Sequence, residues 1–163
     1  MELPEGVDRL RLLFALLLAD ASPRQAEASL RDARASKELI RGVLELIRAR
    51  GDLALVGPAR TAALARWAAS ESGESVLLYA LGIGAEEAAR ELRALRQSFE
   101  RDPLPPRPLL RGEDLTALGL VPGPRFKRLL DDLDDTVLAR RVRTREEALD
   151  WVRASNAEGL SEP

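Results

Sequence analysis

The fold is decided most clearly at residues 118–133, which read LGLVPGPRFKRLLDDL. Two glycines and two prolines fall within the first seven positions, and regular helix cannot continue through them. Helical spacing precedes this break from about Gly112 to Leu118 and resumes at Pro124. The apolar face of the second helix consists of Phe126, Leu129, Leu130 and Leu133. The stretch therefore predicts two helices joined by a tight hairpin.

Helices are also predicted along the rest of the chain, where no segment shows the alternation typical of a strand. The first helix stops near Asp20. Ser22 is the expected N-cap of the second helix, with Gln25 completing a capping box. Ser36 is expected to cap a third helix, which ends at Gly51. The predicted apolar face of the first helix comprises Val7, Leu10, Leu13, Phe14, Leu17 and Leu18.

A proline-rich segment divides the chain. Residues 102–108 read DPLPPRP and hold four of the ten prolines, so a helix that runs to about Arg101 must end there. Near the C-terminus, Thr144 and Glu147 form a capping-box pattern at the start of a last helix. The sequence therefore predicts an all-α fold. We expect a helical bundle body over residues 1–102, a small helix-hairpin-helix-like tail over 103–157 and a disordered end over 158–163.

The composition restricts the chemistry that is open to the chain. Without histidine or cysteine it offers neither imidazole nor thiolate, which excludes Ser-His-Asp and Cys-His nucleophiles and the usual zinc sites. The net charge of −2 argues against a uniformly basic nucleic-acid-binding coat, so a polyanion site has to be local. The N-terminal segment lacks the basic start of a signal peptide and an apolar run that could span a bilayer. We therefore expect a cytoplasmic protein.

The predicted hairpin has the layout of helix-hairpin-helix nucleic-acid modules. A glycine-containing turn lets backbone N–H groups approach a phosphate, and the N-terminus of the second helix adds about half a positive charge. Gly119 and Gly123 are expected to supply positive φ and close approach, and Pro124 to start the helix. Residues 103–128 carry five cations against two anions. The spacing alone also fits a plain helix–helix corner whose glycines serve only the turn.

Four short elements of the C-terminal third occur together. They are Gly112 with Asp114 and Leu115, the Leu118-Gly119 pair, the turn at 122–124 and the TREEAL segment at 144–149. With them, residues 108–152 resemble the C-terminal region of bacterial tRNA nucleotidyltransferases, the CCA-adding enzymes, and their poly(A) polymerase relatives. Residues 35–47, ASKELIRGVLELI, are similar to a helix in the body region of the same family. The match departs at Lys127, where the family more often has a glycine soon after the turn.

This resemblance implies a helical body and tail that hold tRNA, while a separate N-terminal head performs nucleotidyl transfer. In that family the head holds magnesium on an Asp-x-Asp pair behind a glycine-serine loop, and it uses CTP and ATP. No such loop occurs in this sequence, so we expect no catalytic residue, metal site or cofactor in the chain itself. Asp132 and Asp134 have the Asp-x-Asp spacing, but they fall at a predicted helix end, where Arg128 can pair with Asp131 or Asp132.

The function that we predict is RNA binding, with tRNA phosphates on the hairpin and the arginines around it. The segment 139–145, ARRVRTR, either extends this surface or neutralises the aspartates before it. Core packing is favoured over base stacking for Trp67, Tyr79 and Trp151. One alternative is a protein-interaction module that pairs with a separate catalytic subunit, and another is a helix-hairpin-helix DNA binder. The predicted RNA-binding residues are Arg111, Gly112, Gly119, Gly123, Pro124, Arg125, Lys127, Arg128, Arg140, Arg141 and Arg143.

Overall fold

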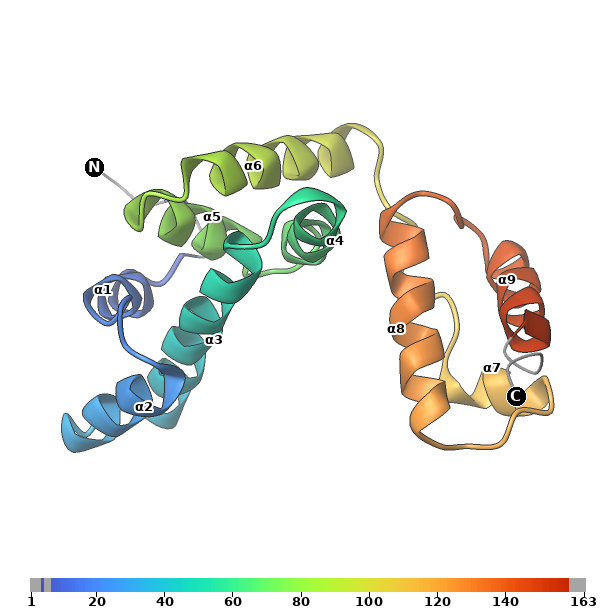
Figure 1. The fold of residues 1–163 in the computed structure, drawn as a ribbon, viewed down its shortest axis with the longest axis horizontal. Helices are drawn as coiled ribbons and strands as arrows, with labels where there is room; N and C mark the ends of the chain where they lie inside the picture. The colour runs from blue at the N-terminus through green and yellow to red at the C-terminus, as the bar shows by residue number, and fades with distance from the viewer. Residues whose placement is uncertain (1–3, 5–6, 159–163) are drawn as a thin grey trace. The chain divides into compact units, whose positions relative to one another are not determined.

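The computed structural model describes Pro4 and residues 7–158, and over these residues it is all-α, with nine helices and no strand (Figure 1). The all-α prediction is confirmed. Two compact units divide between Glu100 and Arg101. The last helix reaches Glu158, and residues 159–163 of the expected disordered end lie outside the described residues.

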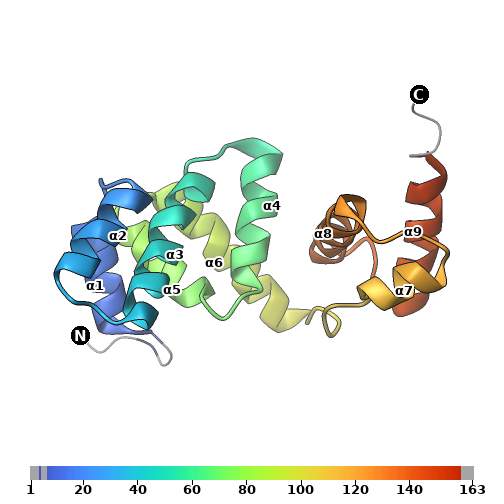
Figure 2. The same cartoon turned by 90° about the horizontal axis from the view of Figure 1, so that it is seen from below.

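The first unit is a helical bundle arranged around one long helix, α3. Its helices are α1 (Arg9–Leu17), α2 (Pro23–Asp32), α3 (Lys37–Leu53), α4 (Gly57–Ala68), α5 (Gly73–Gly82) and α6 (Glu86–Arg101). Helix α3 contacts α1, α2, α4 and α5, as Figures 1 and 2 show from two directions. Its buried face comprises Gly42, Val43, Leu44, Leu46, Ile47, Ala49 and Leu53. Helix α6 adds Ala88, Ala89 and Leu92 to the same core.

The predicted helix starts follow from local side-chain chemistry. The Ser22 hydroxyl oxygen accepts from the Gln25 N–H at 3.3 Å, and the Gln25 side chain accepts from the Ser22 N–H at 2.9 Å. The predicted capping box is thus confirmed, as is the Ser36 cap, which accepts from the Leu39 N–H at 3.1 Å. The predicted end of α3 at Gly51 is wrong. The helix continues to Leu53 because Leu53 is buried and Asp52 accepts a 2.8 Å hydrogen bond from the Trp67 indole.

Helix α1 turns only part of its predicted face to the core, since Val7, Phe14 and Leu18 pack partly buried against it. Leu12 and Ala15 are buried, whereas Leu10, Leu13 and Leu17 are 58%, 61% and 74% exposed. Nearly every position of this helix is apolar, so periodicity could not single out the face that packs on α3 and α5. The result is an apolar surface without a partner among the described residues.

An arginine occupies a position that favours glycine where α2 ends. Arg34 has a φ of 55°, and the N–H of Ala35 donates to the carbonyl of Leu30 at 2.9 Å, which completes a Schellman motif. A side chain in the left-handed region costs about 1 kcal/mol. We predict that Arg34→Gly raises the free energy of unfolding by about this amount. Urea denaturation tests it, and an unchanged or lower value would show that Arg34 has a stabilising role that offsets the strain.

The second unit is a three-helix tail with its own small core. Its helices are α7 (Gly112–Ala117), α8 (Pro124–Leu138) and α9 (Arg145–Glu158), and α8 contacts both of the others. At the start of α9, the N–H of Glu147 donates to Thr144 Oγ1 at 3.2 Å and the N–H of Thr144 to the Glu147 carboxylate at 3.3 Å, the predicted capping box. The buried cluster consists of Leu110, Leu115, Leu129, Leu133, Val137, Val142, Ala148 and Val152.

The two tryptophans and the tyrosine belong to the cores, as predicted. Tyr79 is fully buried in the first unit. Trp67 packs against the same core, and Trp151 packs partly buried against the core of the second unit. Each unit therefore has one tryptophan, because the sequence contains only these two.

Candidate nucleic-acid interface

Helix α7 ends in a turn that requires Gly119. This residue has a φ of 82°, as predicted. The N–H of Gly119 donates to the carbonyl of Thr116 at 2.9 Å, and the N–H of Leu120 to that of Leu115 at 3.1 Å. These two bonds form a Schellman motif, in which a left-handed residue redirects the chain. Gly119 is thus explained by the turn itself.

Gly123 has a different role, and the prediction of positive φ at this position is wrong. Its φ of 174° is extended backbone, which any residue can adopt. A Cβ atom added here would meet nothing within 4 Å beyond the adjacent residues. The fold therefore does not require glycine at position 123. Because Gly123 has no side chain, the space directly in front of the first turn of α8 is open. Another molecule can approach the backbone there.

The N-terminus of α8 has an uncompensated positive charge. No side chain caps it and its first turn has no acidic residue, while Pro124 occupies the first helical position as predicted. Arg125, Lys127 and Arg128 are exposed, and none of them has an ion pair among the described residues. Cations at this end of a helix oppose its dipole. The arrangement is electrostatically unfavourable in the free chain, and a bound anion would relieve it.

The predicted RNA-binding residues fall into two groups. Arg111 and Gly112 begin α7 beside the first turn of α8, since a Cβ on Gly112 would lie 3.9 Å from the ring of Phe126. Arg140, Arg141 and Arg143 follow the other end of α8, a helix of 15 residues and so about 22 Å long (Figure 1). These three arginines are therefore too far from the hairpin to share one phosphate contact with it.

Two of the three distant arginines bind the proline-rich segment. Arg143 Nη2 lies 2.7 Å from Asp102 Oδ2, and Arg140 Nη2 donates to the Asp102 carbonyl at 2.9 Å. The hydrogen bond from Arg143 lowers the pKa of the Asp102 carboxyl. The sequence prediction did not include these contacts, because it considered only phosphate and the α8 aspartates as partners of these arginines. Arg140 has a φ of 59° after α8, and this turn brings the loop back toward Asp102.

Sequence reasoning missed Arg145, which ties α9 to α7. Its guanidinium pairs with the Asp114 carboxylate and donates to the Leu109 carbonyl at 3.2 Å. Asp114 also accepts from the N–H of Arg111 at 2.6 Å, so one carboxylate caps α7 and holds α9. Both residues lie in the sequence elements noted above, Asp114 in Gly-x-Asp and Arg145 in TREEAL. Local spacing cannot reveal that they pair, because they are 31 positions apart.

Arg128 does not form the ion pairs predicted for it at the end of α8. Arg128 makes no ion pair with Asp131 or Asp132 in the described structure, whereas Arg107 binds Asp134 at 2.9 and 3.1 Å. The partner is thus a residue of the proline-rich segment rather than one on the same helix. Within the described residues no group of three or more acidic side chains could hold a metal ion.

The second unit should lose stability in acid. The backbone N–H of Arg111, followed by the Arg145 side chain, lowers the pKa of Asp114 below its ordinary value of 3.8. A lowered pKa gives a contribution that is present above about pH 4 and is lost as the pH falls through the folded-state value. We predict that the midpoint temperature for unfolding of this unit decreases as the pH is lowered below about 4. In Asp114→Asn this decrease should be smaller. Thermal unfolding from about pH 6 to about pH 2.5 checks this, and equal pH dependence in both proteins would contradict it.

Comparison with known proteins identifies the family. A family model described as tRNA nucleotidyltransferase domain 2, putative, matches residues 9–152, nearly the whole chain. The chain belongs to this family. The match covers both units and confirms the resemblance that the sequence motifs indicated. It includes every residue of the hairpin and the first turn of α8.

One curated relative gives the same answer over a shorter span. The CC-adding tRNA nucleotidyltransferase of Thermus thermophilus is 44% identical over 66 residues, which is 40% of this chain and 15% of the relative. The matched segment is thus a small part of that enzyme. The comparison with solved structures found no match. In the part of the chain that is described, no helix has both the length and the apolar character needed to cross a bilayer.

Proposed function

We propose that this chain is an RNA-binding helical region of a tRNA nucleotidyltransferase-like protein and that the hairpin and the start of α8 bind phosphates of tRNA. The observation that carries the proposal is the uncapped N-terminus of α8, with three cations that have no ion pair in the described structure and no acidic residue in its first turn. Membership in the family makes tRNA the expected polyanion. A tRNA-binding role is consistent with the cytoplasmic location expected from the sequence.

The chemistry of this site favours backbone contacts over base readout. Backbone N–H groups at a helix start and flexible cationic side chains bind phosphate oxygens, which are the same for every nucleotide. Val121, at the hairpin between the two helices, is 83% exposed, so the turn projects into solvent. Affinity should therefore depend weakly on sequence and fall steeply with salt. Arg111 lies at the start of α7 in the same part of the unit and is exposed, and Arg141 is exposed at the far end of α8.

The chemical step belongs to a different part of the protein in this proposal. Magnesium and the nucleoside triphosphates CTP and ATP are assigned to a catalytic head, and the helical region holds the tRNA. This division follows the family resemblance, since most of the Thermus thermophilus relative lies outside the matched segment.

An NMR titration tests the location of the site. Unlabelled tRNA is added to the ¹⁵N-labelled chain, and shifts of backbone amides are followed residue by residue. The largest shifts should occur between Gly119 and Arg128, with smaller ones at Arg111 and Gly112. If tRNA binds but leaves the amides of 119–128 unchanged, the hairpin is not the binding site.

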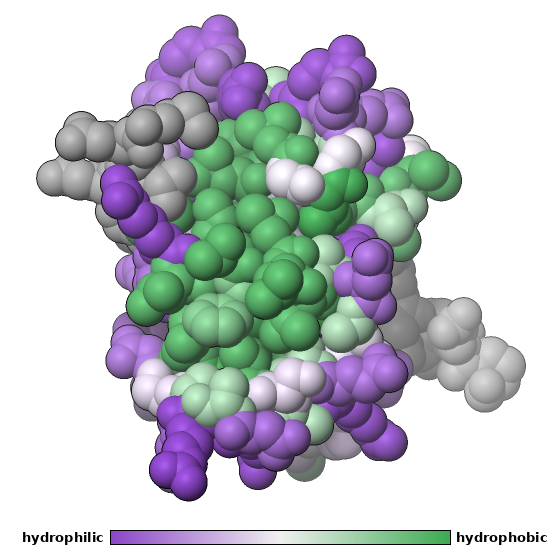
Figure 3. All heavy atoms as spheres, turned by 90° about the vertical axis from the view of Figure 1, so that its left-hand side faces the viewer, coloured by the Kyte–Doolittle hydropathy of each residue, from purple (hydrophilic) through white to green (hydrophobic). Residues whose placement is uncertain are grey.

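The apolar face of α1 favours a second candidate function, docking onto a protein. Leu10, Leu13 and Leu17 recur at helical spacing with more than half of each side chain exposed, and Figure 3 shows a continuous apolar surface on this side of the first unit. Monomeric proteins rarely leave such a patch uncovered. We infer that it packs against the catalytic head of the same kind of enzyme, because the family model describes a second domain.

Complex formation tests this second candidate. The chain is mixed with the part of the Thermus thermophilus relative that lies outside the matched segment, and masses are measured by sedimentation. A stoichiometric complex that Leu13→Gln/Leu17→Gln abolishes supports docking. A dimer of the chain alone that the same variant dissociates would assign the face to a second copy instead, and no complex of either kind would refute docking.

A further inference from the structure

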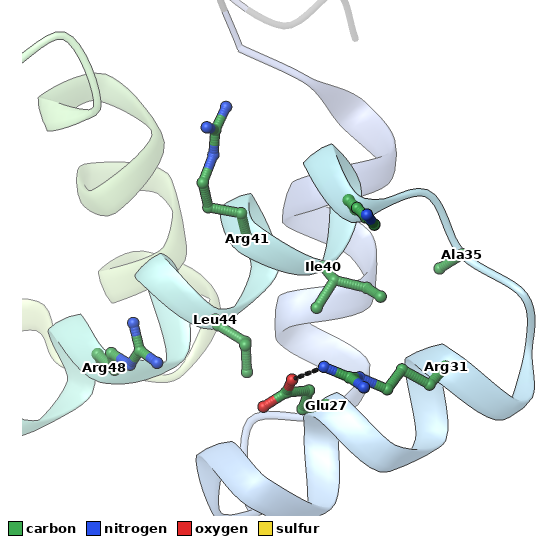
Figure 4. A pocket seen from close by; sticks show the side chains of 8 residues that line it. Glu27, Arg31, Ala35, Ile40, Arg41, Leu44 and Arg48 are labelled. Carbon is green, nitrogen blue, oxygen red and sulfur yellow. Dashed lines mark hydrogen bonds and ion pairs between the residues drawn. The ribbon is translucent and has the colours of Figure 1, made fainter.

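The first unit has a groove with an unusual set of cations. It lies between α2 and α3 and encloses about 530 Å³ (Figure 4). Four basic residues and one acidic residue line it together with three apolar ones. The lining comprises Glu27, Arg31, Ala35, Lys37, Ile40, Arg41, Leu44 and Arg48. None of the groove residues belongs to the predicted RNA-binding set.

The positive charge of this groove is largely uncompensated. Arg31 pairs with Glu27 at 2.6 Å, as the dashed line in Figure 4 marks, and this pair satisfies the one carboxylate in the lining. Lys37, Arg41 and Arg48 are exposed and have no ion pair in the described ranges. Lys37 and Arg41 are four residues apart on α3, a spacing at which like charges destabilise a helix. These cations therefore make no stabilising ion pair within the described fold. Their charges are available to an anionic ligand.

The floor of the groove is apolar. Ile40 and Leu44 project from α3 toward α2 (Figure 4). Leu44 is 6% exposed and Ile40 is partly buried against the core, so the floor is held in place by packing. A rigid apolar floor beside long cationic side chains suits a ligand that has a flat apolar part joined to an anionic group. A nucleotide has both, in its base and its phosphate.

We propose that this groove binds a nucleotide, with the base over Ile40 and Leu44 and the phosphate at Lys37, Arg41 and Arg48. The nucleotide can be part of an RNA strand or a free nucleotide, and both present the same chemistry. The RNA form of this proposal rests on the proposed function, since it adds a second RNA-binding surface to the hairpin. Arginine suits the phosphate because its planar guanidinium can donate two parallel hydrogen bonds.

Charge removal in the groove tests the RNA form. Arg41→Gln/Arg48→Gln should lower the affinity of the full chain for tRNA about tenfold or more at about 0.1 M salt, and it should reduce the slope of log K against log salt by about one to two units. The matched control is Arg24→Gln/Arg93→Gln, which removes two exposed arginines outside the groove. An equal effect of both double variants would mean that only net charge matters, which refutes the site.

An AMP titration separates failure of this proposal from failure of the proposed function. The full chain is titrated with AMP and, as a control, with inorganic phosphate, and amide shifts over residues 35–48 are followed by NMR. Saturable shifts with AMP that Arg41→Gln/Arg48→Gln abolishes support the groove even if tRNA does not bind. Equal shifts with inorganic phosphate would reduce the site to an anion contact and refute the role of the apolar floor. No shift at 35–48 with either AMP or tRNA would refute the proposal while leaving the hairpin site intact.

Discussion

Gly123→Glu combined with Arg125→Glu is expected to lower the affinity for tRNA by about two orders of magnitude at about 0.1 M salt. The first change places a carboxylate in the open space in front of α8, where a Cβ atom would meet nothing within 4 Å beyond the adjacent residues. The second replaces a cation of the first turn, which has no ion pair in the described structure, with an anion. Both repel phosphate and cancel the favourable end of the helix dipole. Fluorescence anisotropy with labelled tRNA measures the change.

Two control variants make this result specific. Arg93→Glu/Ala94→Glu alters the net charge by the same amount on the exposed side of α6 and should change the affinity little. Gly123→Ala should leave the free energy of unfolding unchanged, because neither backbone conformation nor space restricts position 123 to glycine, yet it should weaken tRNA binding. Equal losses for the hairpin and α6 double variants would refute a localised site.

Leu115→Ala should unfold the second unit selectively. Leu115 is fully buried in a cluster of eight buried residues, so the unit has little other core to compensate for a cavity. A substitution of this type costs about 2–5 kcal/mol, which is a large fraction of the stability of a small domain. The hairpin is part of this unit, and tRNA affinity should therefore fall with its folded fraction.

The two tryptophans allow this prediction to be measured unit by unit. In a Trp67→Phe background, the fluorescence of Trp151 reports the second unit alone. Leu115→Ala should shift this transition to lower urea, and Leu64→Ala, at a fully buried site of the first unit, should leave it in place. A shift of the Trp151 transition by Leu64→Ala as large as by Leu115→Ala would show that the two units unfold as one.

Much of the fold could be predicted because its signals are local. The caps at Ser22, Ser36 and Thr144 depend on residues three positions apart, and the end of α6 at Arg101 follows from the prolines after it. The face of α1 could not be predicted in the same way. Apart from Arg9 and Arg11 its residues are apolar, so only the packing partners α3 and α5 decide which leucines are buried.

The hairpin turn and the cations that follow it could be predicted from the sequence, but the ion-pair partners of the other charged residues could not. The glycine-proline turn and the cations after it were evident from the sequence, and the structure gives Arg125, Lys127 and Arg128 no ion pair in the described chain. The partners of the other charged residues depend on tertiary structure. Arg143 meets Asp102 across 41 positions and Arg107 meets Asp134 across 27, distances in sequence that no helical period can reveal. The groove of α2 and α3 was missed for the same reason.

Binding of tRNA by the hairpin is best tested by equilibrium binding of the purified chain to unmodified tRNA, at low and at physiological salt and with duplex DNA for comparison. We expect tight binding to tRNA that weakens by about tenfold or more as the salt rises, with weaker binding to duplex DNA. A preference for duplex DNA would assign the hairpin to DNA instead. The absence of tRNA binding at low salt would contradict the proposed function.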